Sequence, residues 1–71
     1  MDRDSVDSSM MSSIGYDQSS GTVEVEFRPN GQVWQYYDVP ESTYNDVRAS
    51  GSLGKAFNAM IKNSFREARV G

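Results

Sequence analysis

The sequence contains no cysteine, no histidine and no long hydrophobic run. Without cysteine it can form no disulfide bond, and without cysteine and histidine it lacks the side chains of the usual zinc sites and the usual base of neutral-pH catalysis. Uninterrupted apolar stretches reach only three residues, whereas a membrane-spanning helix needs about 20. Residues 1–4 do not resemble a secretory leader either. We therefore expect a cytoplasmic protein without a membrane partner.

Charge is divided unequally along the chain. Residues 1–46 contain nine acidic and two basic residues, a net charge of −7, whereas residues 47–71 contain five basic residues and one acidic residue, a net charge of +4. The formal total is −3. This division favours a partner recognised through electrostatics, and a simple need for solubility explains it as well.

The chain has 71 residues, enough for one domain with a small core. Residues 1–10 are rich in serine and aspartate, a composition that cannot bury enough surface to offset the entropy lost on ordering. We expect these ten residues to form a mobile acidic N-terminal tail. Residues 11–71 are expected to form a single α+β domain, and we expect a monomer.

Alternating apolar residues predict three antiparallel strands in the first half of the chain. They cover residues 14–17, 22–27 and 32–37. Between the last two strands lies Asn30-Gly31, the dipeptide most typical of a two-residue hairpin turn. The sequence therefore predicts a β-meander.

The turn at residues 30–31 determines which side chains face each other. In a two-residue turn, Phe27 lies opposite Trp34 and Val25 lies opposite Tyr36, and both aromatic residues of the last strand are in the core. A three-residue loop with a bulge would instead turn Trp34 and Tyr36 to the outer face, since a one-residue slip inverts a strand. The first register gathers the apolar residues on one face, so we favour it.

Helical signals fill the second half. Pro40 and Glu41 suit the first turn of a helix, and Gly51 suits its end. From Leu53 onward, apolar residues recur at helical spacing, and four basic residues gather on the opposite side. These four are Lys55, Lys62, Arg66 and Arg69. The predicted fold is α+β, a three-stranded antiparallel β-meander followed by two helices packed on one sheet face.

A series of residues from Val6 to Val70 resembles the KTSC domain family. It comprises Val6, Ser8, Ser9, Ile14, Gly15, Tyr16, Asp17, Val23, Glu24, Val25, Glu26, Phe27, Gly31, Trp34, Gln35, Tyr36, Val39, Pro40, Tyr44, Gly54, Phe57, Asn58, Ile61, Lys62, Arg69 and Val70. The family is named after a C-terminal appendage of some lysyl-tRNA synthetases and also includes free-standing bacterial and phage proteins. The resemblance implies no activity by itself, and the synthetase association suggests RNA binding.

No group of residues predicts catalysis, a metal or a cofactor. Glu24 and Glu26 are expected on an exposed strand face, where nothing favours acid–base work. The aspartates of the tail lack the glycine and the distal glutamate of a calcium loop. Residues 51–55 lack the first glycine of a phosphate-binding loop, and Ala56 stands where serine or threonine would bind magnesium, so we interpret them as a helix–helix turn.

Protein binding is the function that we expect. The predicted contact face is an amphipathic sheet surface rimmed by acid, and the aspartates of the tail would attract a basic partner over distance. The face comprises Glu24, Glu26, Tyr37, Val33 and Gln35, and the tail contributes Asp2, Asp4 and Asp7. The most concrete expectation is a phage-type or bacterial accessory protein that binds a basic surface of the host transcription machinery, RNA polymerase, and modulates transcription.

RNA binding is the alternative. The basic helix face formed by Lys55, Lys62, Arg66 and Arg69 could follow a phosphate backbone. An ordinary solvated helix face accounts for the same four charges, just as solubility accounts for Glu24 and Glu26 on the hairpin.

Overall fold

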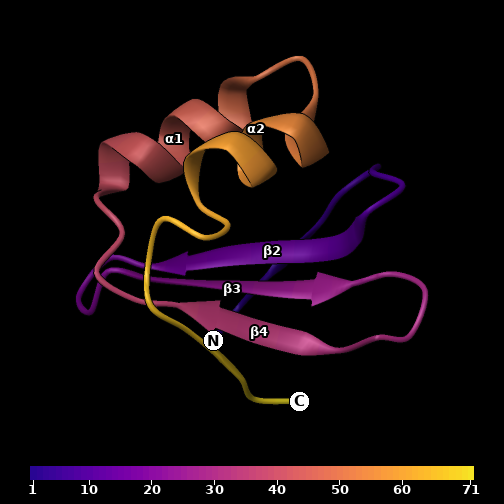
Figure 1. Cartoon of the computed structure of the whole chain (residues 1–71), viewed down its shortest axis with the longest axis horizontal. Helices are drawn as coiled ribbons and strands as arrows, with labels where there is room; N and C mark the ends of the chain where they lie inside the picture. Colours follow the sequence, from indigo (N-terminus) through magenta and orange to yellow (C-terminus); the bar gives the residue numbers. More distant parts are fainter.

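A five-stranded antiparallel sheet covered on one face by two helices makes up the structure, a computed structural model of residues 1–71 (Figure 1). The spatial order of the strands follows the chain, β1-β2-β3-β4-β5. The strands are β1 (Asp4–Ser5), β2 (Met11–Asp17), β3 (Thr22–Phe27), β4 (Val33–Tyr36) and β5 (Glu67–Arg69). The helices are α1 (Glu41–Ala49) and α2 (Leu53–Met60). The α+β class and the placing of both helices on one face are as predicted.

The predicted three-stranded meander has two strands fewer than the observed five-stranded sheet. The predicted strands are the central three, β2, β3 and β4, and two short edge strands flank them. β1 has two residues and β5 has three, so neither is long enough to show an alternating pattern. Both lie in segments whose composition predicted something else, a mobile tail and the end of a helix.

The hairpin of β3 and β4 has a different register from the one predicted. Val25 pairs with Trp34 and Val23 pairs with Tyr36, a shift of two residues. The reason is a loop of four residues, 28–31, closed by a hydrogen bond from the Phe27 N–H to the Gln32 carbonyl oxygen of 2.8 Å. Because the shift is even, it leaves every side chain on its predicted face.

The second helix is shorter than predicted. The spacing of apolar and basic residues from Leu53 onward suggested a helix that includes Lys62, Arg66 and Arg69, but α2 ends at Met60. The N–H groups of Ile61 and Lys62 both donate to the Phe57 carbonyl oxygen, and Asn63 then adopts a φ of 66°. Asparagine tolerates this left-handed conformation better than most residues, so it reverses the chain and sends it to β5.

Nine buried apolar side chains form one core between the helices and the inner face of the sheet. They are Met11, Ile14, Val23, Val25, Tyr36, Val39, Val47, Phe57 and Ile61. Phe57 joins the two layers, with its ring edge-on to Tyr36 at 5.2 Å and to Phe27 at 5.8 Å between centroids. Trp34 lies on the inner face as predicted, but it is only partly buried at the rim of this core. Neither helix is long and apolar enough to cross a bilayer.

Candidate functional site

The outer face of the sheet, on the side away from the helices, carries the residues predicted to contact a protein. Glu24 is not exposed there, contrary to the prediction, since only 8% of it is accessible. Arg3 Nη1 lies 2.6 Å from Glu24 Oε2, and Gln35 Nε2 donates to Glu24 Oε1 at 2.8 Å. Both carboxylate oxygens therefore have partners within the chain, which leaves Glu24 little capacity for a partner outside it.

A chain of polar contacts extends from Glu24 across the outer face. The Tyr37 hydroxyl donates to Gln35 Oε1 at 3.0 Å, which links Tyr37 to Glu24. In the other direction, Arg3 Nη2 lies 3.7 Å from Glu26 Oε1, which also accepts a hydrogen bond from Ser13 Oγ at 3.3 Å. We call these six residues the outer-face network: Ser13, Glu26, Arg3, Glu24, Gln35 and Tyr37. It fixes the side chains of four of the five predicted contact residues.

The N-terminal segment closes the outer face over Glu24. The Asp2 carbonyl oxygen and the Arg3 Cα lie directly against Gly15, where any Cβ would collide with them. Asp4 then pairs with Ile14 in the sheet and forms an ion pair with Arg48 of α1 at 3.2 Å. Of the tail aspartates, Asp2, Asp4 and Asp7 are all exposed. The structure thus brings residues 2–5 onto the sheet, and the mobility of the tail stays a prediction.

Two exposed apolar side chains accompany the outer-face network. Val70 and Met1 are 52% and 51% exposed, and they are the large hydrophobic residues that the fold leaves open. The Val70 N–H donates to the Val33 carbonyl oxygen at 2.8 Å, so Val70 continues the edge beside Val33. Met1 begins the segment that crosses Gly15. The sequence could not show this grouping, because Val70 followed a predicted helix and Met1 belonged to a predicted tail.

The predicted basic helix face does not exist as a continuous surface. Lys55 is on α2, Lys62 and Arg66 are in the segment that follows it, and Arg69 is on β5. Arg66 stacks over the Tyr37 ring at 5.4 Å and lies 3.8 Å from Asp38. Arg69 pairs with Trp34 across the β4–β5 ladder. The early end of α2 separates the four cations.

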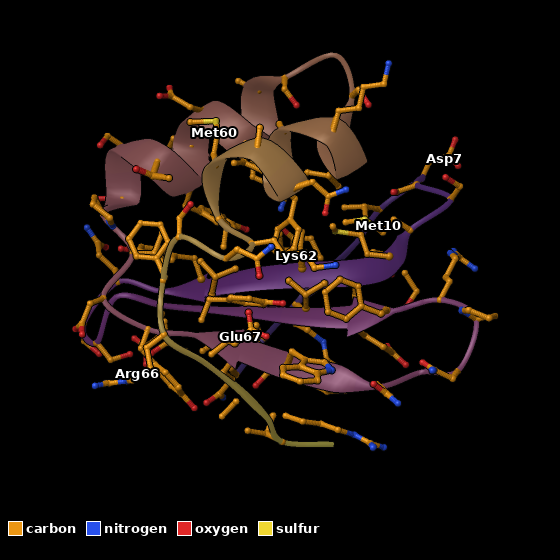
Figure 2. All side chains as sticks on the ribbon, in the orientation of Figure 1. Asp7, Met10, Met60, Lys62, Arg66 and Glu67 are labelled. Atoms are coloured by element: carbon orange, nitrogen blue, oxygen red, sulfur yellow. The ribbon has the colours of Figure 1, made fainter.

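A cavity of about 260 Å³ opens beside Trp34 on the inner face, between the tip of the β3–β4 hairpin and the segment after α2. We call it the Trp34 cavity. Its lining consists of Met10, Phe27, Arg28, Asn30, Gln32, Trp34, Tyr36, Lys62 and Glu67. In Figure 2, Met10 and Lys62 lie above the strands, on the helix side, and Glu67 lies in front of the strands. Aromatic rings, cations and amides therefore meet in one place that the sequence did not predict.

A larger and more polar groove of about 440 Å³ separates residues 7–10 from the start of α2. Its lining includes Ser8, Ser9, Gly54 and Asn58, four of the residues that carry the family resemblance. Lys55 lines it as well. Gly51 and Ser52 form the helix–helix turn that was predicted there, and Leu53 begins α2.

The local surroundings shift the pKa values of three acidic groups, Tyr36, Tyr16 and Asp17. Burial raises the pKa of Tyr36 to about 12, with a smaller contribution from the Glu67 carboxylate. Burial likewise raises the pKa of Tyr16, whose hydroxyl donates to the Val39 carbonyl oxygen at 2.6 Å. Hydrogen bonds from Ser19 and Ser20 lower the pKa of Asp17, the last residue of β2. No three acidic side chains come together as ligands for a metal ion.

Comparisons with known proteins agree on one family. The family model of the KTSC domain matches residues 7–65. A lysine–tRNA ligase of Nostoc punctiforme is 34% identical over 58 residues, which are 82% of this chain and 10% of the ligase. A protein of Tsukamurella paurometabola is 33% identical over 61 residues, 86% of this chain and 90% of that protein. The crystal structure of a KTSC domain protein from Yersinia pestis superposes with a TM-score of 0.92 at 36% identity, covering 99% of this chain and 97% of the other.

Proposed function

The chain belongs to the KTSC domain family, and from that premise we propose that it is a non-catalytic module that binds a protein through the outer face of its sheet. In its most concrete form, the proposal is a bacterial or phage-type accessory protein. It acts in the cytoplasm, docks on a basic surface of the transcription machinery, RNA polymerase, and modulates transcription. The ligase from Nostoc punctiforme indicates that a domain of this family can be a small part of a larger protein.

The observation that carries the proposal is the grouping of exposed apolar and ordered polar side chains on one face. Val70 and Met1 supply accessible apolar area, and Val33 lies next to Val70. Tyr37 is held by its hydrogen bond to Gln35 and by the Arg66 guanidinium, so it loses little conformational freedom on binding. Protein interfaces combine accessible apolar area with polar side chains that can hydrogen-bond to the partner.

Charge favours a basic partner. The Glu26 side chain remains 36% exposed despite its contact with Arg3, and the chain as a whole carries a formal charge of −3. Exposed Asp2 and Asp7 add to the field that steers a cationic surface toward the chain. Surfaces that bind nucleic acid are rich in lysine and arginine, so they offer the complementary charge.

The role of Glu24 changes in this proposal. Because it is bonded to Arg3 and Gln35, Glu24 positions the contact residues and does not itself contact the partner. Asp4 forms an ion pair with Arg48 at the β1 edge of the sheet, so we do not include it among the contact residues. The contact residues that we propose are Glu26, Val33, Tyr37, Val70 and Met1.

A binding experiment with purified bacterial RNA polymerase tests this assignment. We expect the wild-type chain to bind saturably, more weakly as salt rises, and equally well after nuclease treatment of the polymerase. Glu26→Lys combined with Val70→Ser should weaken binding about tenfold or more, since the first change reverses an exposed charge and the second removes exposed apolar area on the proposed contact face.

Asp46→Lys provides the matched control. Asp46 is exposed on α1, in the helix layer, and the change alters charge as much as Glu26→Lys does. It should leave binding unchanged. Equal binding by the folded double variant, or an equal loss in Asp46→Lys, would contradict the outer-face proposal, and no binding at all would exclude RNA polymerase as the partner.

A second candidate function, nucleic-acid binding, is favoured by a different observation. The basic helix face that first suggested it is not formed, but Lys62 and Arg69 both lie near Trp34 on the inner side of the sheet. Neither is paired with an acidic side chain, although Arg69 Nε donates to the Gly71 carbonyl oxygen at 2.9 Å. Cations beside an aromatic ring are the features that single-stranded nucleic acids require.

A further inference from the structure

We propose that the Trp34 cavity binds a nucleobase together with its adjoining phosphate. The inference is independent of the outer-face proposal, because Trp34 and the outer-face network lie on opposite faces of the same sheet. It deepens the second candidate function by naming the site, and it moves that site from a helix face to the rim of the core.

Aromatic side chains give the cavity a surface on which a base can stack. Trp34, Phe27 and Tyr36 all line it, and Trp34 is partly buried, so part of its indole faces the opening. Trp34 Nε1 donates to Gln32 Oε1 at 3.2 Å, which fixes the plane of the ring. A ring that is already oriented loses little freedom when a base stacks on it.

Two cations without a carboxylate partner line the cavity beside this ring. Three of the seven basic side chains, Arg3, Arg48 and Arg66, are within 4.0 Å of a carboxylate. Arg28 and Lys62, which line the cavity, are not. Arg28 Nε donates to the Ser8 carbonyl oxygen at 3.1 Å, so the guanidinium is anchored beside the opening with its terminal nitrogens free for a phosphate.

A third cation lies on the same face of the sheet. Arg69 is the cross-strand partner of Trp34, and partners in an antiparallel ladder project from the same face. Arg28 and Lys62 line the cavity from two different elements, the β3–β4 loop and the segment after α2. Arg69 on β5 is outside the lining, and its Nε donates to the Gly71 carbonyl oxygen at 2.9 Å. Glu67 is the single carboxylate in the lining, and it can accept a hydrogen bond from an exocyclic amino group of a base.

Amide groups at the hairpin tip can recognise the edge of a base. The side-chain oxygen of Asn30 accepts a hydrogen bond from the Gln32 N–H, and the side-chain oxygen of Gln32 accepts one from Trp34 Nε1. Their NH₂ groups make no hydrogen bond within the chain, so each can donate to a ring nitrogen or a carbonyl oxygen of a base. A volume of about 260 Å³ is small beside the roughly 300–1,000 Å³ of typical ligand pockets, which favours one nucleotide over a larger cofactor.

The single tryptophan provides the readout, since Trp34 is the only one in the chain. The experiment titrates the full chain at low salt with the four ribonucleoside monophosphates, with inorganic phosphate, and with short single-stranded RNA and DNA. We expect saturable quenching of Trp34 emission by nucleotides and none by phosphate alone. Tighter binding of the oligonucleotides would identify a single strand as the source of the base, and equal affinity would identify free nucleotides; both results support the cavity.

Charge variants separate this site from a general attraction to cations. Lys62→Glu should weaken binding about tenfold and reduce its dependence on salt, because a phosphate contact is lost. Lys55→Glu makes the same change on an exposed lysine that lines the other groove, and it should leave affinity within about twofold of wild type. Equal weakening by the two variants would overturn the proposal.

Ring variants test the stacking itself, with a fluorescent label on the nucleic acid as the readout. Trp34→Phe keeps an aromatic face and should retain most of the affinity, whereas Trp34→Leu should lower it about tenfold or more. Circular dichroism establishes that each variant is folded. If no nucleotide or oligonucleotide changes Trp34 emission up to millimolar concentration, the cavity does not bind a nucleobase.

Discussion

Tyr36 is a buried side chain whose ionisation makes the stability of the fold depend on pH. Its ring packs against Phe57 and is 2% exposed. Burial, assisted by the Glu67 carboxylate, raises its pKa from 10.0 to about 12. The folded chain therefore holds the phenol proton at pH values where the unfolded chain releases it.

Alkaline pH should consequently destabilise the fold through Tyr36. The stabilisation is fully present below pH 10, the pKa in the unfolded chain, and is lost as pH rises toward 12. The full loss is on the order of 3 kcal/mol. Urea unfolding at successive pH values measures it, and Tyr36→Phe should flatten this part of the profile. A Tyr36→Phe profile as steep as that of wild type would contradict the assignment.

The alternation of residues in the central strands predicted which side chains are in the core, but it did not predict how the strands pair. Alternation in residues 22–27 and 33–36 was enough to place Tyr36 and Val25 inside, because a strand has only two faces. The register could not be obtained in the same way, since the length of the loop at residues 28–31 depends on contacts of Phe27 and Gln32 across the hairpin. Because the predicted register was wrong by two residues, an even number, the residues predicted to face inward and outward on this hairpin are correct.

At the scale of elements, the segment before β2 was the main surprise. Its composition gave no sign that Arg3 and Asp4 contact β3 and α1 respectively. These are long-range contacts between residues 21 and 44 positions apart, which no local pattern reveals. For the same reason, the sequence presented Glu24 as an exposed contact residue and missed both Met1 and the Trp34 cavity.

Removing the charge of Arg3 should destabilise the fold because it leaves the Glu24 carboxylate buried without its cation. We expect Arg3→Gln to cost about 1–3 kcal/mol in urea unfolding. Adding Glu24→Gln should recover part of that loss, since no buried charge then remains.

Arg66→Gln is the control for this prediction. Arg66 and its partner Asp38 are highly exposed, so their ion pair should contribute less than about 1 kcal/mol. If Arg3→Gln were as mild as Arg66→Gln, the N-terminal segment would not rest on the sheet as described.

At the scale of the whole molecule, stability depends on one small core. A 71-residue domain is expected to have about 4–10 kcal/mol of folding free energy. Phe57 contacts both Phe27 and Tyr36 from α2, so it connects the helix layer to the sheet. No second core is present to maintain either layer if that connection fails.

Phe57→Ala should therefore cost about 3–5 kcal/mol, close to the entire stability of the domain. Thermal unfolding monitored by circular dichroism should show both layers melting together at a much lower temperature. Asn58→Ala, an exposed change at the next position of α2, should stay within about 0.5 kcal/mol of wild type. A cost below about 1.5 kcal/mol for Phe57→Ala would show that the layers do not depend on this contact.

Both ends of the chain lie on the side of the sheet away from the helices (Figure 1). Asp2 rests against Gly15, and Gly71 packs close to Val33. A purification tag, a dye or a sensor-chip tether attached at either terminus would consequently obstruct the outer face and leave α1 and α2 accessible. Immobilisation through an engineered cysteine at Ser42, exposed on α1, would present that face unobstructed, and the natural absence of thiols makes the attachment site unique.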